Sequence, residues 1–251
     1  MKGRPMETAG ELERADDERL AWRRVAGAGP TVVWLGGFRS EMSGTKAQAL
    51  ADWALARSRA FLRFDYLGHG VSSGAFETGT IGRWREDALA VIDALTEGPL
   101  VLVGSSMGGW LAVLAALARP ERVQALVLIA PAADFTEALM APEIPPEGRA
   151  ALARNGVWLR PSLYGDPYPI TARLLEEGKV WSVLTGATIP ITAPVRILQG
   201  GEDPDVPWRH ALRLAEALEG PDVVFTLIRD GDHRLSREAD IARLIAEIES
   251  V

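Results

Sequence analysis

The sequence contains no cysteine among its 251 residues and only three histidines, His69, His210 and His233. The absence of cysteine excludes disulfide bonds, a thiolate nucleophile, a cysteine-ligated zinc site and an iron–sulfur cluster. Three histidines without paired spacing also argue against a catalytic zinc site. We therefore expect no metal and no cofactor, and any histidine-based catalysis has to use one of these three residues.

Acidic residues outnumber basic ones, and only three of the basic residues are lysines. The chain has 27 lysines and arginines against 34 acidic residues, a formal net charge of −7. This excess of negative charge disfavours nucleic acid and anionic membranes as partners. The N-terminal sequence MKGRPMETAGELERADDER lacks the apolar core of a signal peptide, so a cytoplasmic location is expected.

One uncharged stretch, residues 98–118, is nominally long enough to cross a bilayer. Its centre reads GSSMGG, and these small residues fit a tight turn better than the middle of a lipid-facing helix. We interpret the stretch as a strand, a turn and a buried helix, and expect no integral membrane segment.

Apolar runs alternate with amphipathic stretches along most of the chain. This alternation predicts an α/β fold, a mostly parallel central sheet with helices on both faces. Strands are predicted at 19–25 (as an edge strand), 31–35, 61–64, 100–103, 124–129, 195–199 and 223–228. Helices are predicted at 45–58, 80–95, 107–118 and 207–218, with a last helix whose N-cap is Ser236.

The alternation stops at Pro131 and resumes near residue 191. We predict that 132–190, which is rich in proline and bulky apolar residues, is a small cap inserted into a core made of 1–131 and 191–251. Short helices are expected around 147–155 and 170–185. The large side chains of the cap would either line an apolar substrate pocket or pack the cap onto the core, and periodicity does not separate these alternatives. The candidates are Met140, Trp158, Tyr164, Tyr168 and Trp181.

Residues 104–108, Gly-Ser-Ser-Met-Gly, fit the pattern G-x-S-x-G between a predicted strand and a predicted helix. In that context the pattern is typical of a nucleophile on a strained turn, where flanking glycines relieve crowding and the helix N-terminus favours negative charge. Ser106 is therefore the candidate nucleophile, and Ser105 occupies a variable position.

A serine hydroxyl needs a base, and His233 is the histidine in the right place. It follows the last predicted strand, which is where the chain order Ser, Asp, His of this kind of site puts the base. His210 falls inside a predicted helix, and His69 precedes the nucleophile in the chain.

The acid that orients the base is expected after the preceding strand. Asp203 and Asp205 both lie there, and we favour Asp203 because Asp205 stands where it would cap the next helix. Asp134, which follows the strand at 124–129, is a third candidate, because its strand ends at the same crevice.

Two backbone N–H groups are needed to stabilise an oxyanion. Met107 follows the nucleophile and supplies one donor, and Phe38, after the pair Gly36-Gly37, is expected to supply the other. Leu35, and not a histidine, stands directly before the two glycines.

Taken together, these residues resemble the α/β-hydrolase superfamily across nearly the whole chain. More specific segments resemble the palmitoyl-protein thioesterase and acyl-glucuronide deglucuronidase branch of the α/β-hydrolase-domain family. They are LGGFRSEMSGTKA, FLRFDYLGHGVSSG, TIGRWREDAL, GPLVLVGSSMGGWLAVLAALARPERV, NGVWLRPSLY and EDPDVPW. The resemblance implies Ser106 as nucleophile, Asp203 in G-x-x-D-x-x-V-P and His233 in D-H-R. The sequence departs from the branch in lacking a transit peptide and in having Gln199 where a histidine is common.

The resulting hypothesis is a serine hydrolase whose partner is a small-molecule or lipid-acyl ester or thioester. A general carboxylesterase, a C–C hydrolase, a peptidase and a non-catalytic binding module on the same fold stay as alternatives. The sequence does not indicate an oligomeric state.

Overall fold

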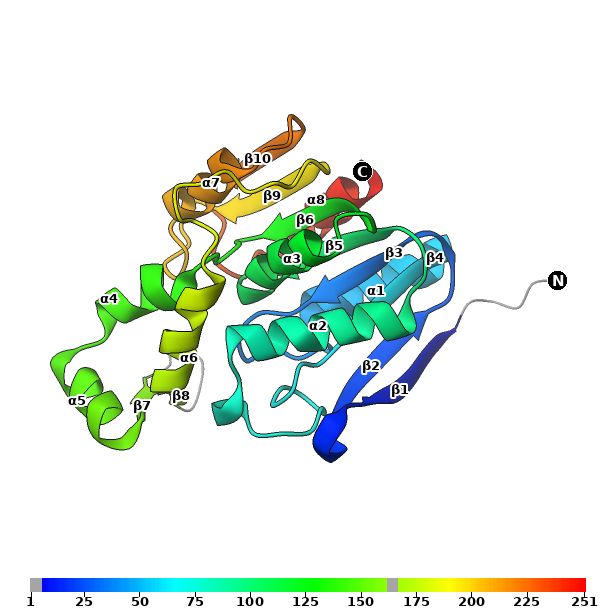
Figure 1. Cartoon of the computed structure of the whole chain (residues 1–251). Helices are drawn as coiled ribbons and strands as arrows, with labels where there is room; N and C mark the ends of the chain where they lie inside the picture. The colour runs from blue at the N-terminus through cyan, green and yellow to red at the C-terminus, as the bar shows by residue number, and fades with distance from the viewer. Residues whose placement is uncertain (1–5, 162–166) are drawn as a thin grey trace.

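The computed structural model describes residues 6–161 and 167–251, and it is built on one central sheet (Figure 1). Eight strands lie in the order β1-β2-β4-β3-β5-β6-β9-β10, parallel from β4 to β10 and antiparallel where β2 joins β1 and β4. This confirms the predicted mostly parallel sheet. The strands are β1 (Glu7–Glu13), β2 (Arg19–Val25), β3 (Ala28–Leu35), β4 (Arg59–Phe64), β5 (Leu100–Ser105), β6 (Val123–Ile129), β9 (Val195–Gly200) and β10 (Val223–Ile228).

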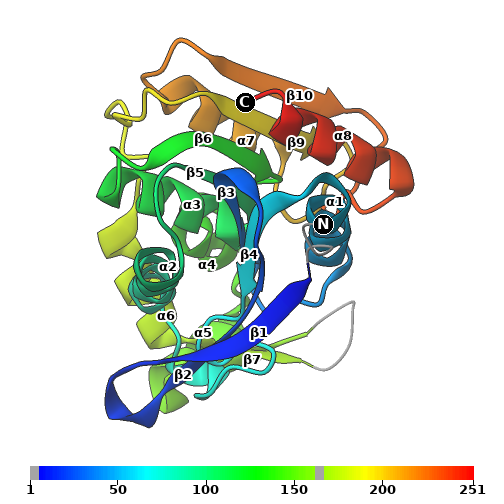
Figure 2. The same cartoon turned by 90° about the vertical axis from the view of Figure 1, so that its right-hand side faces the viewer.

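Helices cover both faces of the sheet, as Figure 2 shows. α1 (Thr45–Arg57) and α8 (Glu238–Glu249) lie on one face, and α2 (Ile81–Leu95), α3 (Met107–Ala118) and α7 (Trp208–Ala217) lie on the other. Consecutive strand residues divide between the two cores, so that Val32 packs on the α1 side and Val33 on the α3 side. Strands buried on both faces read as continuous apolar runs, which is why these segments show no alternation.

The uncharged stretch at 98–118 forms β5, a turn and α3. β5 is buried along its whole length, and α3 is buried from Met107 to Ala116. No helix in the described residues combines the length and the apolar character needed to span a bilayer.

Two details differ from the sequence predictions. β2 is not the edge strand, because β1 pairs with it over its full length, with Gly10 opposite Trp22. β1 reads ETAGELE and carries too few apolar residues to be recognised, but Gly10 leaves room for the Trp22 ring, which a Cβ there would meet at 2.4 Å. The N-cap of α8 is Arg237 rather than Ser236.

The segment 132–190 leaves the sheet between β6 and β9 and lies beyond the carboxyl ends of the parallel strands (Figure 1). Its elements are a π-helical turn at Thr136–Met140, α4 (Ala141–Glu143), α5 (Pro146–Asn155), β7 (Val157–Arg160), β8 (Tyr168–Thr171) and α6 (Ala172–Gly178). It contains a pair of antiparallel strands, β7 and β8, that was not predicted. The helix predicted at 170–185 is shorter in the structure, where α6 ends at Gly178 and a 3-10 turn at Lys179–Trp181 follows it.

Candidate active site

Ser106 lies on the turn between β5 and α3 in a strained conformation, with φ 55° and ψ −120°. The flanking glycines make this turn possible, since a Cβ on Gly104 would lie 2.3 Å from the carbonyl oxygen of Gly108, and one on Gly108 only 2.0 Å from that of Leu35. The N–H of Ser106 donates to the carbonyl oxygen of Ile129 at 2.8 Å. Such strain persists only where the surroundings hold it, and it is typical of functional sites.

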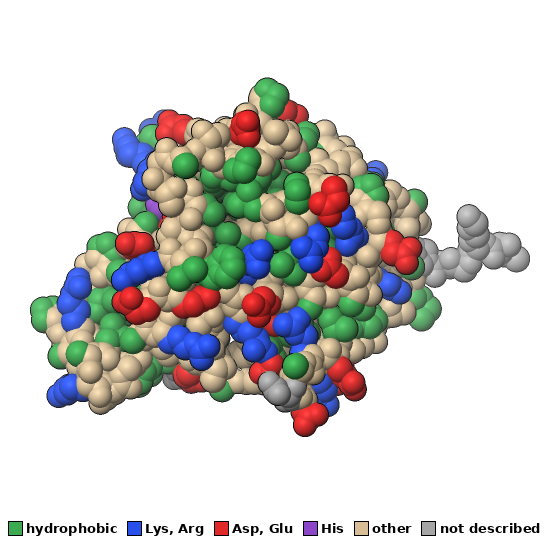
Figure 3. Space-filling model, in the orientation of Figure 1, with side chains coloured by type: hydrophobic (Ala, Val, Ile, Leu, Met, Phe, Trp, Pro, Cys, Tyr) green, Lys and Arg blue, Asp and Glu red, His purple; other side chains and the backbone are tan. Residues whose placement is uncertain are grey.

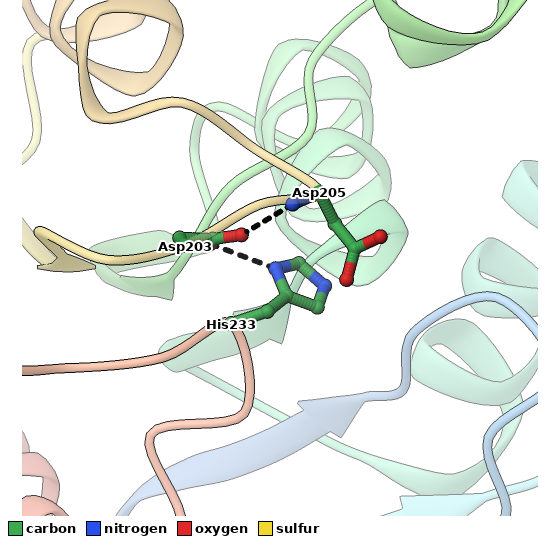
Figure 4. Close-up of side chains that lie close together, drawn as sticks. All are labelled: Asp203, Asp205 and His233. Atoms are coloured by element: carbon green, nitrogen blue, oxygen red, sulfur yellow. Dashed lines mark hydrogen bonds and ion pairs between the residues drawn. The ribbon is translucent and has the colours of Figure 1, made fainter. Parts of the chain in front are cut away.

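His233 contacts both predicted partners. Its Nε2 lies 3.1 Å from the Oγ of Ser106, and its Nδ1 lies 2.8 Å from Oδ2 of Asp203. Asp203 comes from the loop after β9 and His233 from the loop after β10, so three strand ends bring together residues up to 127 positions apart. Figure 4 shows the imidazole facing the Asp203 carboxylate. This is the geometry that a serine nucleophile, a base and an orienting acid require.

The Asp203 carboxylate is fully buried but has hydrogen-bond donors on both oxygens. Oδ1 accepts the backbone N–H groups of Asp205 and Val206 at 2.9 and 2.8 Å, and Oδ2 accepts the side-chain amide of Gln199 at 3.1 Å as well as His233. These hydrogen bonds hold the carboxylate in one orientation toward His233. Gln199, where the resembled family often has histidine, is therefore a direct partner of the acid.

The two other candidate acids are engaged differently. Asp134 accepts the backbone N–H groups of Val183 and Leu184, at 2.8 to 3.1 Å, and so joins the two ends of the 132–190 segment. Asp205 is exposed and lines the cavity at the site.

Asp203, Asp205 and His233 each offer one possible metal-ligand atom, and these three atoms lie within 4.8 Å of one another (Figure 4). However, both ring nitrogens of His233 are already in hydrogen bonds to Ser106 and Asp203. A metal ion would have to displace one of these contacts, so the cluster fits acid–base chemistry better than metal binding.

The predicted oxyanion donors lie beside Ser106. A Cβ built on Gly37 would lie 3.4 Å from the Cβ of Ser106, so the loop after β3 touches the candidate nucleophile. Within the described part of the chain, no acceptor takes the backbone N–H of Phe38 or of Met107. Both residues line the cavity at Ser106. These two N–H groups are therefore free to bind a substrate oxygen, which keeps them as candidates.

A cavity of about 710 Å³ opens at Ser106 between the strand ends and the 132–190 segment. Its lining contains both apolar and polar side chains. The apolar ones include Phe38, Met107, Phe135, Leu139, Met140, Tyr168 and Val206, and the polar ones include Arg39, Glu41, Ser43, Lys46, Glu143, Arg160, Asp205 and Ser236. On the outside, acidic and basic side chains are interspersed over the face that Figure 3 shows.

The large side chains of the predicted cap divide into two groups. Met140 and Tyr168 line the cavity, whereas Trp158 and Trp181 are not among its lining residues. Trp158 packs against Gly148, and Trp181 donates its indole N–H to Glu177 at 2.6 Å. The two tryptophans therefore pack elements of the segment together, and only Met140 and Tyr168 of the described candidates stay in place to contact a substrate. Tyr164 lies outside the described residues.

His69 and His210 are buried and hydrogen-bonded to backbone. Nε2 of His69 accepts the N–H of Arg39 at 3.2 Å, and Nε2–H of His210 donates to the carbonyl oxygen of Ala133 at 2.7 Å. Burial lowers the pKa of His69 to about 4 and also lowers the pKa of His210. Both rings are therefore neutral at neutral pH, but they bond to backbone, whereas His233 contacts Ser106, which agrees with the choice of His233 as the base.

Lys46, in the first turn of α1, is a site residue that the sequence analysis did not single out. Its ammonium donates to the carbonyl oxygen of Arg234 and to the Oγ of Ser236, the latter at 3.3 Å. It thus ties α1 to the loop that carries His233. Burial, its largest influence, lowers the pKa of Lys46 to about 8. The one sequence signal for Lys46 was its place in the run SGTKA, which resembles the thioesterase branch.

The comparisons with known proteins agree on one family. A family model described as serine aminopeptidase, S33, matches residues 29–176. The mitochondrial palmitoyl-protein thioesterase ABHD10 of Mus musculus is 39% identical over 242 residues, which cover 96% of this chain and 81% of that protein. The protein of that name from Homo sapiens is 38% identical over the same share of this chain.

Solved structures give the same result. A crystal structure of a protein from Agrobacterium vitis S4 is 45% identical with a TM-score of 0.92, covering 98% of both chains. The α/β-hydrolase domain-containing protein 10 from mouse is 39% identical with a TM-score of 0.88, covering 97% of both chains. The curated relatives are named as mitochondrial, and the cytoplasmic location expected here stays a prediction. By sequence and by fold, the chain belongs to the α/β-hydrolase family and is a hydrolase.

Proposed function

We propose that the chain is a serine hydrolase that cleaves acyl esters or thioesters through an acyl-enzyme on Ser106. The observation that carries this proposal is the pair of contacts at His233, with Nε2 3.1 Å from the Ser106 hydroxyl and Nδ1 2.8 Å from Asp203. A base within hydrogen-bond reach of a nucleophile, itself oriented by an acid, supports nucleophilic catalysis.

In the first half of the reaction, Oγ of Ser106 attacks the acyl carbonyl carbon while His233 takes the hydroxyl proton. Asp203 stays ionised and stabilises the imidazolium that forms. The backbone N–H groups of Phe38 and Met107 bind the oxyanion, and one such donor is typically worth about 3 kcal/mol of transition-state stabilisation.

Collapse of the tetrahedral intermediate breaks the bond to the leaving group. Imidazolium His233 gives its proton to the departing alcohol or thiol, and the acyl chain stays esterified to Ser106. A water molecule then attacks the acyl carbon, His233 takes its proton, and a second collapse returns that proton to Ser106 and releases the carboxylic acid.

The shape of the cavity supports an acyl substrate. Phe135, Leu139 and Met140 offer apolar contacts for an acyl chain, and polar lining side chains such as Lys46 and Ser43 suit a leaving group that carries polar atoms. The related mouse protein is named a palmitoyl-protein thioesterase, which supports thioesters within this class.

A fluorophosphonate probe tests the nucleophile. We expect the purified protein to be labelled and Ser106→Ala to remain unlabelled, with Ser105→Ala as the matched control that keeps labelling. An unlabelled wild-type protein would refute the serine hydrolase and favour a non-catalytic binding module.

The substrate class is tested by p-nitrophenyl esters and acyl thioesters from C2 to C16. We expect hydrolysis that depends on chain length. Aminoacyl p-nitroanilides belong in the same panel, because the matching family model is described as a serine aminopeptidase. Cleavage of the anilides alone, with no ester or thioester turned over, would replace this proposal with a peptidase.

A further inference from the structure

His69 is buried under the loop that follows β3, and no step of the proposed mechanism uses it. The ring is 3% exposed, and both of its nitrogens are hydrogen-bonded to backbone. Nε2 accepts the N–H of Arg39 at 3.2 Å, while Nδ1–H donates to the carbonyl oxygen of Leu67 at 3.2 Å. Because Nε2 has to be the acceptor, one neutral tautomer satisfies both bonds. His69 therefore connects the loop after β4 to the loop after β3.

The residue that His69 holds has an unusual conformation. Arg39 has φ 57°, in the left-handed region that residues with a Cβ avoid. Its N–H belongs to the peptide that directly follows Phe38, the proposed oxyanion donor. The same loop has a second anchor, since Oδ1 of Asp65 accepts the N–H of Met42 at 2.6 Å. A strained loop with two buried acceptors beneath it is held in place by its surroundings.

Ring packing joins His69 to the side chain of Phe38 as well. The His69 ring contacts Phe76 and Trp84 edge to face, with centroids 5.2 and 5.1 Å away. The Phe38 ring contacts the same two rings at 4.9 and 5.8 Å. The backbone and the side chain at Phe38 are thus positioned from the same buried cluster.

We infer that His69 is a positioning residue that holds the loop after β3 so that the N–H of Phe38 faces the oxyanion at Ser106. This inference rests on the proposed function, because it assigns a role relative to the acyl transition state. A donor helps only if it already points to where the negative charge develops, so a displaced loop should slow the reaction without weakening substrate binding.

The test compares three substitutions of His69. His69→Phe keeps an aromatic ring and removes both nitrogens, His69→Asn keeps a donor near Leu67 and withdraws the acceptor from Arg39, and His69→Gln keeps an acceptor within reach of Arg39. The matched control is His210→Phe, since His210 is also buried and backbone-bonded, but it lies in α7 and bonds to Ala133 instead of to the loop after β3. Each variant is assayed for kcat and KM on p-nitrophenyl acetate, for affinity toward a boronic acid, and for thermal unfolding.

We expect kcat to fall roughly 10- to 100-fold in His69→Phe, below the loss typical of deleting a whole oxyanion donor, with KM changed less than about threefold. Boronic acid affinity should fall in parallel with kcat. His69→Gln should recover at least about tenfold over His69→Asn, and His210→Phe should keep kcat within about threefold of the wild type.

Equal kcat values in the Asn and Gln variants would overturn the inference, and that comparison stands even if the Phe variant does not fold. An equal loss of kcat in His210→Phe would also overturn it, because the effect would then be general destabilisation. Fluorophosphonate labelling of the wild type is scored separately, so failure of the proposed function is distinguished from failure of this inference.

Discussion

The crevice at the strand ends and the 132–190 segment that faces it are held in place in different ways. Ser106, Asp203 and His233 come from turns at the ends of strands of the central sheet, and each is fixed by hydrogen bonds to backbone or to another of the three. The facing segment presents Met140 and Tyr168 from a short helical run and a two-stranded hairpin. The candidate catalytic residues thus lie on the central sheet, and the side chains that face them lie on the segment inserted between β6 and β9.

Side-chain hydrogen bonds close the facing segment on itself and join it to the core. At one end of the segment, the carboxylate of Asp134 accepts the backbone N–H groups of Val183 and Leu184 from the other end. Glu177 accepts the N–H of Gly82, at the start of α2 in the core, at 3.1 Å. Contacts of this kind are easier to loosen than a β-strand in a buried sheet. Changes in the crevice should therefore alter kcat, whereas changes in the segment should alter KM and chain-length preference.

The largest expected effect is in the crevice at Ser106. Ser106→Ala should lower kcat by about 10⁵-fold or more, since the covalent step is removed. Its thermal midpoint should change little, because Ser106 keeps its backbone hydrogen bonds and loses only its side-chain contact with His233. Steady-state hydrolysis of p-nitrophenyl esters and thermal unfolding measure both quantities. Residual activity within a hundredfold of the wild type would contradict the proposed nucleophile.

The next effect separates two neighbouring carboxylates. Asp203→Asn should lower kcat by about 10⁴-fold, because an amide no longer stabilises the imidazolium and allows the wrong tautomer. Asp205→Asn, the matched control, should lower kcat less than about fivefold, since its carboxylate is exposed and Nδ1 of the imidazole bonds to Asp203. The reverse order of losses would move the acid to Asp205.

A smaller loss of kcat is expected when Lys46, which joins α1 to the loop that carries His233, is replaced. Lys46→Met should lower kcat by about tenfold, since the loop loses a charged donor at Arg234. Lys179→Met is the control, because that lysine pairs on the surface with Glu176. Comparable losses in the two variants would show that the tie does not position the base.

The same lysine gives a pH-dependence of stability. Burial lowers the pKa of Lys46 from 10.5 to about 8 in the folded protein. Above pH 8 the unfolded chain therefore binds more protons than the folded one, and the free energy of unfolding rises with pH relative to Lys46→Met. Between pH 8 and 9.5 urea denaturation should show a relative gain of about 2 kcal/mol. If the free energies of unfolding of the wild type and of Lys46→Met changed in parallel with pH, the lowered pKa of Lys46 would be contradicted.

The smallest expected effect is in the facing segment. Asp134→Ala removes the acceptor that joins its two ends, so KM for a dodecanoyl ester should rise by about threefold to fivefold while kcat for an acetyl ester stays within about twofold. Glu137→Ala, an exposed neighbour, is the control. A loss confined to kcat would show that the segment supports the chemistry instead of the substrate.

Local chemistry explains which parts were predictable. The strands, α2 with Thr80 as its N-cap, and the turn at Ser106 follow from apolar runs, caps and glycines within a few residues of each other. β1 was missed because its sequence carries no buried face, and it is recognisable only by its pairing with β2. The sequence also leaves open whether Trp181 contacts substrate or packs the segment, because its contacts with Glu177 and Trp110 are known only from the fold.

The sequence by itself determined that any histidine base had to be one of three residues, and its strand, turn and helix pattern determined where Ser106 would lie. Only the tertiary structure decided what each histidine does. Hydrogen bonds act over about 3 Å, and the partners of His69, His210 and His233 lie on other loops, up to 127 positions away. Chain order identified the residue that contacts Ser106, but only packing showed that the other two are neutral, buried ties between backbone segments.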